Sequence, residues 1–106
     1  MPPRVVRLAD LPAALDAERI DVLATGGAFR FEHILSGAQA SPPGSWYDQD
    51  DDEWACLVAG RATLAFEDGA VDLVAGDAIL IPAHVRHRVA RSDDAVWLAL
   101  HFTQPT

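Results

Sequence analysis

The chain has only one cysteine, Cys56, among its 106 residues. A single thiol cannot form an intramolecular disulfide or a zinc site built from several cysteines. Stability must therefore come from a packed core, and hydrophobic residues make up 50% of the sequence, which is ample for one domain of this length. The lack of disulfides fits a reducing compartment, so we expect a cytoplasmic protein.

Basic residues are also scarce, with eight Lys and Arg against sixteen Asp and Glu, and the formal net charge is −8. Such a charge repels nucleic-acid phosphates and anionic membrane surfaces. Neither a run of about 18 apolar residues nor a signal-type apolar stretch near the N-terminus is present in the sequence. We therefore expect a small-molecule ligand and no nucleic-acid or membrane partner.

Helix signals are confined to residues 10–19, "DLPAALDAER", where an aspartate can cap a short helix and a proline fits its first turn. The remaining sequence consists of short alternating or apolar runs separated by turn signals roughly every eight to twelve residues. This spacing leaves no room for crossover helices and predicts an antiparallel β-sandwich or barrel. We expect one domain, in which residues 1–28 form an N-terminal arm with the helix and residues 29–106 form the barrel.

The segment "WYDQDDDEW", residues 46–54, combines aromatic and acidic residues. Alternate side chains of a strand point to opposite faces. One face would carry Tyr47, Gln49, Asp51 and Glu53. The other would carry Trp46, Asp48, Asp50, Asp52 and Trp54, and we expect its aspartates to be a solvated surface. A calcium loop is excluded because the required glycine and final glutamate are missing.

Downstream, the segment "GDAILIPAHVRH" begins at Gly76 and resembles the second conserved motif of the cupin family. Pro82 and His87 stand at the proline and histidine positions of that motif. Upstream, Glu53 and Gly60 match the end of the family's first motif. Both motifs are therefore represented, at a spacing found in many small cupins.

The resemblance covers residues 29–102 and implies an all-β fold, the antiparallel double-stranded β-helix or jelly-roll barrel of cupins. It also implies a homodimer, because cupins commonly dimerise through their sheets. The sequence departs from the second motif at His84 and Arg91, where glycine and asparagine are usual. It departs from the first motif at Tyr47 and Gln49, where the family usually has a His-x-His pair.

Cupins hold a divalent transition metal, such as iron, manganese, nickel or zinc, with these histidines, the glutamate and the second-motif histidine. Carried over to this chain, the resemblance implies Gln49, Glu53 and His87 as ligands, which would offer an amide oxygen, a carboxylate and an imidazole. His101, in "WLALHF", is on the polar face of its predicted strand and is the candidate for the fourth ligand. His33 and Tyr47 are the alternatives.

Three functions are compatible with this sequence. The first is a metal-dependent isomerase, decarboxylase or dioxygenase acting on a small metabolite, with Tyr47 or His84 as the catalytic residue that handles a proton. The second is a metal-free barrel that binds or senses a small molecule. The third is a regulatory interaction module with tryptophans in a dimer interface.

Each candidate residue also has a purely structural interpretation. The Gln–Glu–His set can be a satisfied polar cluster, and His33 and His101 can be core histidines. The arginines of "HVRHRVAR" could clamp an anionic substrate or pair with Asp48–Asp52. Cys56 is expected to be a small buried hydrophobe rather than a nucleophile.

Overall fold

The protein is described by a computed structural model that covers residues 2–10, 15, 17–38, 40–42 and 44–104. Its described part is built from antiparallel strands, and the predicted all-β fold is confirmed. The strands are β1 (Arg19–Thr25), β2 (Phe29–Ser36), β3 (Asp52–Phe66), β4 (Gly69–Val74), β5 (Ala78–Ile81) and β6 (His87–Phe102). The sheet order is β1-β2-β6-β3-β4, and β5 pairs with β3 beside it.

The predicted N-terminal helix over residues 10–19 is not seen. Residues 11–14 and 16 lie outside the described residues, and the described neighbours Asp10, Leu15, Ala17 and Glu18 are not helical. So short a helix depends on packing against the rest of the fold, whereas Ala17 and Glu18 are exposed. No helix long and apolar enough to cross a membrane occurs among the described residues.

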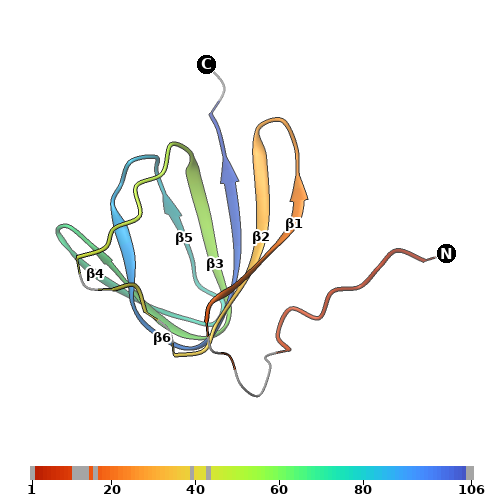
Figure 1. Ribbon diagram of the computed structural model, residues 1–106, viewed down its shortest axis with the longest axis horizontal. Helices are drawn as coiled ribbons and strands as arrows, with labels where there is room; N and C mark the ends of the chain where they lie inside the picture. The colour runs from red at the N-terminus through yellow and green to blue at the C-terminus, as the bar shows by residue number, and fades with distance from the viewer. Residues whose placement is uncertain (1, 11–14, 16, 39, 43, 105–106) are drawn as a thin grey trace.

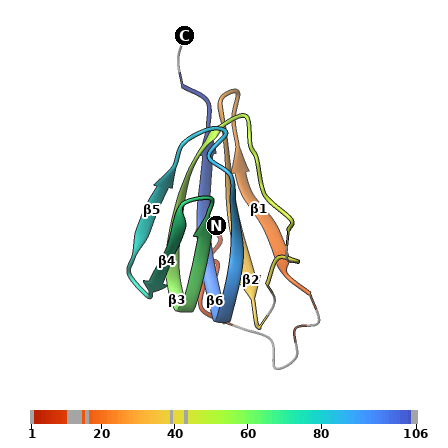
Figure 2. The same ribbon diagram turned by 90° about the vertical axis from the view of Figure 1, so that its left-hand side faces the viewer.

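Two long strands, β3 and β6, give the molecule its shape. They pair along most of their length and curve strongly, so that their two ends lie in different walls of an open barrel (Figures 1 and 2). The pairing shifts register on both sides of Ala59, next to Gly60, whose φ is 80°. A side chain at Gly60 would collide with the backbone carbonyls of Asp93 and Asp94 on β6. Glycine is therefore required where the two strands bend across each other.

The apolar core lies between the walls at the closed end of the barrel. It is made of small and branched side chains with one tryptophan, and such a mixture fills the taper between two curved walls. Its buried members are Ala55, Leu57, Ala62, Leu64, Leu73, Ile81, Ala95 and Trp97.

Candidate functional site

Between the walls lies a cavity of about 120 Å³. Its floor is apolar, including Leu64 and Trp97 from the core. Its polar lining comes from the segment before β3, from β2, β3 and β6, and from the residue preceding β1. These polar side chains are Glu18, Glu32, Tyr47, Gln49, Glu53, His87 and His101.

The predicted division of residues 46–54 between two faces is confirmed for Tyr47, Gln49 and Glu53, whereas Asp51 is not among the residues that line the cavity. Tyr47, Gln49 and Glu53 line the cavity, whereas Asp50 and Trp54 are exposed to solvent. Only the end of this segment belongs to β3, but the chain before it is held in register by the first residue of β6 and by the loop that precedes it. The backbone N–H of Tyr47 donates to the carbonyl of His87 at 2.7 Å, and the reverse bond measures 3.1 Å.

His87, the first residue of β6, is buried at the cavity wall with 6% of its surface exposed. Its Nδ1 lies 3.0 Å from the carbonyl oxygen of Val85. A carbonyl only accepts hydrogen bonds, so Nδ1 carries the hydrogen and Nε2 of the neutral ring keeps its lone pair. This Nε2 lies 3.8 Å from Oε1 of Glu53.

His101, which pairs with Glu53 across the β3–β6 ladder, is held in a similar way. Its Nε2 lies 3.0 Å from Oε1 of Glu32 and donates to that carboxylate. The other ring nitrogen, Nδ1, is buried and has no hydrogen-bond partner. Oδ1 of Asp51 is 3.6 Å away, which is too far for a hydrogen bond. In the neutral form of the ring, Nδ1 would therefore hold an unsatisfied lone pair inside the protein.

Glu53 interacts electrostatically with both imidazoles. It faces His101 across the β3–β6 ladder and is 8% exposed. Burial raises the pKa of its carboxyl group, while His101 and His87 act in the opposite direction. All four predicted metal ligands, Gln49, Glu53, His87 and His101, therefore line the same cavity.

Glu32 is a site residue that sequence reasoning did not propose. Besides accepting from His101, it accepts a hydrogen bond from Nε of Arg30 at 2.9 Å through Oε2. In the sequence, Glu32 shares the charged face of an alternating strand with Arg30. The structure turns that face toward the cavity, so this charged face was the sequence feature that could have identified Glu32.

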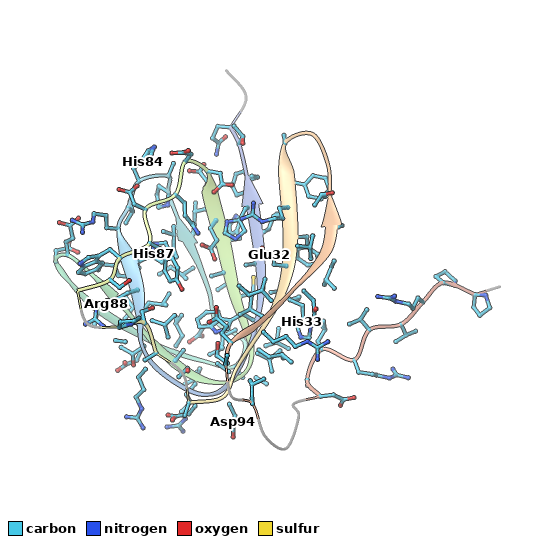
Figure 3. All side chains as sticks on the ribbon, in the orientation of Figure 1. Glu32, His33, His84, His87, Arg88 and Asp94 are labelled. Atoms are coloured by element: carbon cyan, nitrogen blue, oxygen red, sulfur yellow. The ribbon has the colours of Figure 1, made fainter. Side chains whose placement is uncertain are left out.

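The alternative ligand His33 points to the other face of β2. Its Nε2 donates to the carbonyl of Leu8 at 2.9 Å, and it borders a separate polar cleft beside the N-terminal arm (Figure 3). Alternate residues of a strand point to opposite faces. Glu32 and Ile34 line the cavity, so His33, which stands between them, points away from it.

His84, predicted as a catalytic residue, lies in the loop before β6 and is not among the residues that line the cavity. It is exposed and adopts a φ of 64°. Its Nδ1 lies 2.8 Å from Oδ1 of Asp48, and its backbone N–H donates to the carbonyl of Gln49 at 2.8 Å. These two contacts of His84 hold residues 46–50 against this loop, and we call them the clasp.

We expect this clasp to depend on pH. The hydrogen bond to Asp48, with help from its charge and that of Asp50, raises the pKa of His84 above its ordinary value. The clasp is then fully formed below the ordinary histidine pKa and is lost as the pH rises through the raised value. NMR titration should show a higher pKa for His84 than for its counterpart in an Asp48→Asn variant. Equal values in the two proteins would contradict the clasp.

Of the two alternatives for the arginines of the basic segment, pairing with Asp48–Asp52 is not seen in the described contacts. Arg86 and Arg88 instead lie over the ring of Trp46, at 5.4 and 5.8 Å from its centroid. Asp52 accepts from the backbone N–H of Ala83 and from the side chain of Gln104, both at 2.7 Å. These bonds lower the pKa of Asp52. The aspartates turned away from the cavity thus include two with defined partners, Asp48 and Asp52.

Comparisons with known proteins agree with this architecture. A family described as the cupin domain matches residues 30–101. A solved structure from Ralstonia eutropha JMP134, described as a candidate mannose-6-phosphate isomerase, is 39% identical, with 96% of this chain and 100% of that chain covered and a TM-score of 0.89.

Two more distant structures share the fold. A cupin superfamily protein from Desulfitobacterium hafniense DCB-2 is 21% identical, with coverage of 95% and 92% and a TM-score of 0.81. The structure of KdgF from Halomonas sp. is 16% identical, with coverage of 91% and 89% and a TM-score of 0.71. No curated protein matches the chain. The motifs, the barrel and the family match over most of its length together show that this chain belongs to the cupin domain family.

Proposed function

We propose that this cupin binds a divalent transition-metal ion and a small polar metabolite in its cavity. Glu53, His87 and His101 would hold the ion, and Gln49 would complete the set with its amide oxygen. The observation that carries the proposal is the hydrogen bonding of the two imidazoles: each has one ring nitrogen fixed by an outer acceptor, so that in the neutral ring the other nitrogen keeps a lone pair for a metal ion. For His101 that other nitrogen, Nδ1, is buried without a hydrogen-bond partner.

This arrangement is the one that metal-binding histidines usually have. Such a histidine donates its second ring N–H to a carboxylate or a backbone carbonyl, which fixes its orientation and raises its basicity. Val85 provides the carbonyl for His87, and Glu32 provides the carboxylate for His101. An ion bound by Nδ1 of His101 would also relieve a buried polar atom that otherwise destabilises the fold.

In this structure the proposed ligand side chains are not arranged around a common metal position. Among the described residues, no three His, Cys, Asp or Glu side chains stand in a metal-holding arrangement. Nε2 of His87 and Oε1 of Glu53 are 3.8 Å apart, so we propose that small side-chain rotations bring the donors to the ion. The histidine pair of the first motif is replaced by Tyr47 and Gln49, and His101 from the other end of the chain would supply the second imidazole.

When bound, a divalent ion acts as a Lewis acid that polarises an oxygen atom of a ligand. The chain's own residues would select and orient that ligand. The ring of Tyr47 lies 5.6 Å from that of His87, and Tyr47 is 45% exposed, so its hydroxyl is available at the edge of the cavity. Trp97 provides an apolar floor. Isomerisation, decarboxylation or oxygen chemistry would each be compatible with this arrangement.

Titration of metal-free protein with Zn²⁺ or Mn²⁺ tests this function. We expect saturable binding by calorimetry, and we expect Glu53→Gln to weaken it because the replacement removes the only charged ligand of the set. The matched control is Asp50→Asn, since the side chain of Asp50 is fully exposed. Equal binding by wild type and Glu53→Gln would contradict the proposed site and would favour a metal-free binding barrel.

The charges around the cavity also restrict the ligand. Three glutamates line it, and none of the eight arginines, all of which lie in the described part of the chain, is among the lining residues. Arg30 is held by Glu32, and Arg86 and Arg88 stack on Trp46. A phosphate group would therefore meet a negative wall with no free guanidinium to pair with.

We predict that the cavity prefers uncharged or cationic ligands. With metal-loaded protein, mannose 6-phosphate should bind no more tightly than mannose when both are titrated under protein-observed NMR. The relative described as a candidate mannose-6-phosphate isomerase makes this pair a direct comparison. If the phosphorylated sugar bound about tenfold more tightly, a difference of about 1.4 kcal/mol, the charge argument would be wrong.

A further inference from the structure

The polar cleft that His33 borders lies outside the barrel, between the N-terminal arm and the side of β1 and β2 that is turned away from the cavity (Figures 1 and 3). The arm, residues 2–8, is extended and belongs to none of the strands. Its end is fastened to the sheet by the bond from His33 to the carbonyl of Leu8. We call this space of about 400 Å³ the arm cleft. His33 and Leu35, which are 5% and 3% exposed, form its buried part.

The charged lining of the arm cleft differs from that of the cavity. Three of the eight arginines line it, Arg4 and Arg7 from the arm and Arg19 from the start of β1. The acidic side chains described in its lining are Asp10 and Asp21. The cleft therefore has one positive charge in excess, although the chain as a whole has a net charge of −8. Such a local basic concavity in an acidic protein attracts anions.

The two guanidinium groups of the arm are available to a ligand. This acidic chain offers many carboxylate partners, and Arg30, for example, is held by Glu32 at 2.9 Å. Within the part of the chain that the structure describes, Arg4 and Arg7 form no ion pair. An unpaired guanidinium presents N–H donors in a planar fork that fits two oxygens of a phosphate or carboxylate group. Both side chains can therefore bind an anion without first breaking an ion pair.

The third arginine of the cleft, Arg19, is restrained by the sheet. Its Nε lies 3.0 Å from Oδ2 of Asp21, which pairs with His33 in the β1–β2 ladder. A guanidinium held in this way still has N–H donors for a second acceptor. Because the side chain is already oriented, it loses less conformational freedom when a ligand binds. The cleft thus combines one restrained arginine on the sheet with two unpaired arginines on the arm.

The volume and the apolar lining of the arm cleft indicate a ligand larger than an inorganic anion. Its volume of about 400 Å³ falls within the range of about 300–1,000 Å³ that is usual for small-molecule sites. Apolar side chains from the arm and from both strands also line it, and they can contact carbon atoms of a ligand. These side chains are Val6, Val22, Leu23 and Leu35.

We propose that the arm cleft binds a small phosphate monoester. Its phosphate group would accept hydrogen bonds from Arg4, Arg7 and Arg19, and its organic part would lie against the apolar side chains. A phosphate group suits three arginines better than a carboxylate does, because it carries about two negative charges and three acceptor oxygens. The β1–β2 layer separates this site from the cavity, so the proposal does not depend on whether the cavity holds a metal ion.

Protein-observed NMR on the untagged full chain tests this site, with phenyl phosphate and inorganic phosphate as probes. We expect saturable shifts of the backbone signals of Arg19, His33 and Leu35, and a dissociation constant of about 1 mM or lower for phenyl phosphate. Inorganic phosphate should bind more weakly, because it makes no apolar contact. The signals of Glu53 and His101 report on the cavity, so a probe that binds there is distinguished from one in the arm cleft.

Replacing single charges separates a defined site from a general charge effect. Arg7→Gln should raise the dissociation constant of phenyl phosphate about fivefold or more, because it removes a charge-assisted hydrogen bond. Arg61→Gln is the matched control, since Arg61 is also exposed but lies outside the cleft. Asp10→Asn should lower the dissociation constant, because it removes a negative charge from the lining. Arg7 and Asp10 are exposed and belong to no strand, and circular dichroism should show an unchanged fold.

Four results would overturn the proposal. Shifts that do not saturate, or that sodium chloride reproduces at the same ionic strength, would exclude a specific phosphate site. Shifts confined to Glu53 and His101 would place the phosphate group in the cavity instead. Equal losses of affinity in Arg7→Gln and Arg61→Gln would reduce the effect to net charge. Phenyl phosphate that bound no more tightly than inorganic phosphate would overturn the role of the apolar lining.

Discussion

The His101→Gln variant should bind a divalent transition metal at least about 100-fold more weakly than wild type. Nδ1 of His101 is the buried nitrogen without a hydrogen-bond partner, and its lone pair is the donor that the fold leaves free in the cavity. Glutamine can still donate toward Glu32 but offers no imidazole lone pair. Glu32→Gln should weaken binding by a smaller factor, roughly 10- to 100-fold, because it removes only the outer acceptor that orients the ring.

His33→Gln is the control for this series. His33 is as deeply buried as His101, at 5% against 4% exposed, but it lies on the opposite face of the sheet. Its replacement should leave metal affinity unchanged, as measured by calorimetry or by competition with a chelating dye. A similar loss of affinity in His33→Gln and His101→Gln would show that the effect comes from general destabilisation rather than from a lost ligand.

The largest effect on stability is expected for Gly60→Ala. The φ of 80° is a conformation in which a side chain is strained, by roughly 1–3 kcal/mol. In addition, the new Cβ would meet the backbone carbonyls of Asp93 and Asp94, which are not free to rotate away. We expect the free energy of unfolding to fall by more than about 2 kcal/mol and the Tm by roughly 10 °C or more.

Gly27→Ala is the natural comparison for that variant. A Cβ at Gly27 meets nothing within 4 Å, so its stability should change by no more than about 0.5 kcal/mol. Thermal and urea unfolding followed by circular dichroism measure both. If Gly60→Ala were as stable as Gly27→Ala, the result would contradict the claim that β6 passes too close to Gly60 to leave room for a side chain.

Alternation along the chain predicted the cavity side of residues 46–54 correctly. The prediction held even though Tyr47 and Gln49 precede β3, because backbone hydrogen bonds to the loop of residues 82–87 keep that segment extended and in register. The second-motif histidine, His87, also lines the cavity as the resemblance implied. Local periodicity combined with a family motif was therefore enough to bring most of the candidate site together.

What alternation cannot show is which face of a strand turns inward. In residues 29–35 the apolar set includes Phe31, which lies on the sheet face turned away from the cavity, while Glu32 turns to the cavity. An apolar stripe may mark a core in one protein and an interface in another, and only the position of the neighbouring strands distinguishes them. For the same reason Glu32 was overlooked and His33 was kept as an alternative ligand.

The remaining differences concern contacts between distant segments. The short helix over residues 10–19 was predicted from local propensity, which is weak without packing. Pairing with Asp48–Asp52 was one of two alternatives for the arginines of the basic segment. In the structure Asp48 lies 2.8 Å from Nδ1 of His84, and Arg86 lies over the ring of Trp46. Opposite charges are abundant in this chain, so sequence alone does not identify which pairs meet.

Elemental analysis of untagged protein, as purified and again after reconstitution with Mn²⁺, Fe²⁺, Ni²⁺ or Zn²⁺ and removal of excess ion, tests the metal site most directly. The arrangement of Glu53, His87 and His101 predicts about one transition-metal ion per chain that survives buffer exchange. It also predicts loss of that ion in the His87→Ala variant. Protein that carries no stoichiometric metal as purified, and retains none after reconstitution, would contradict the proposed metal centre.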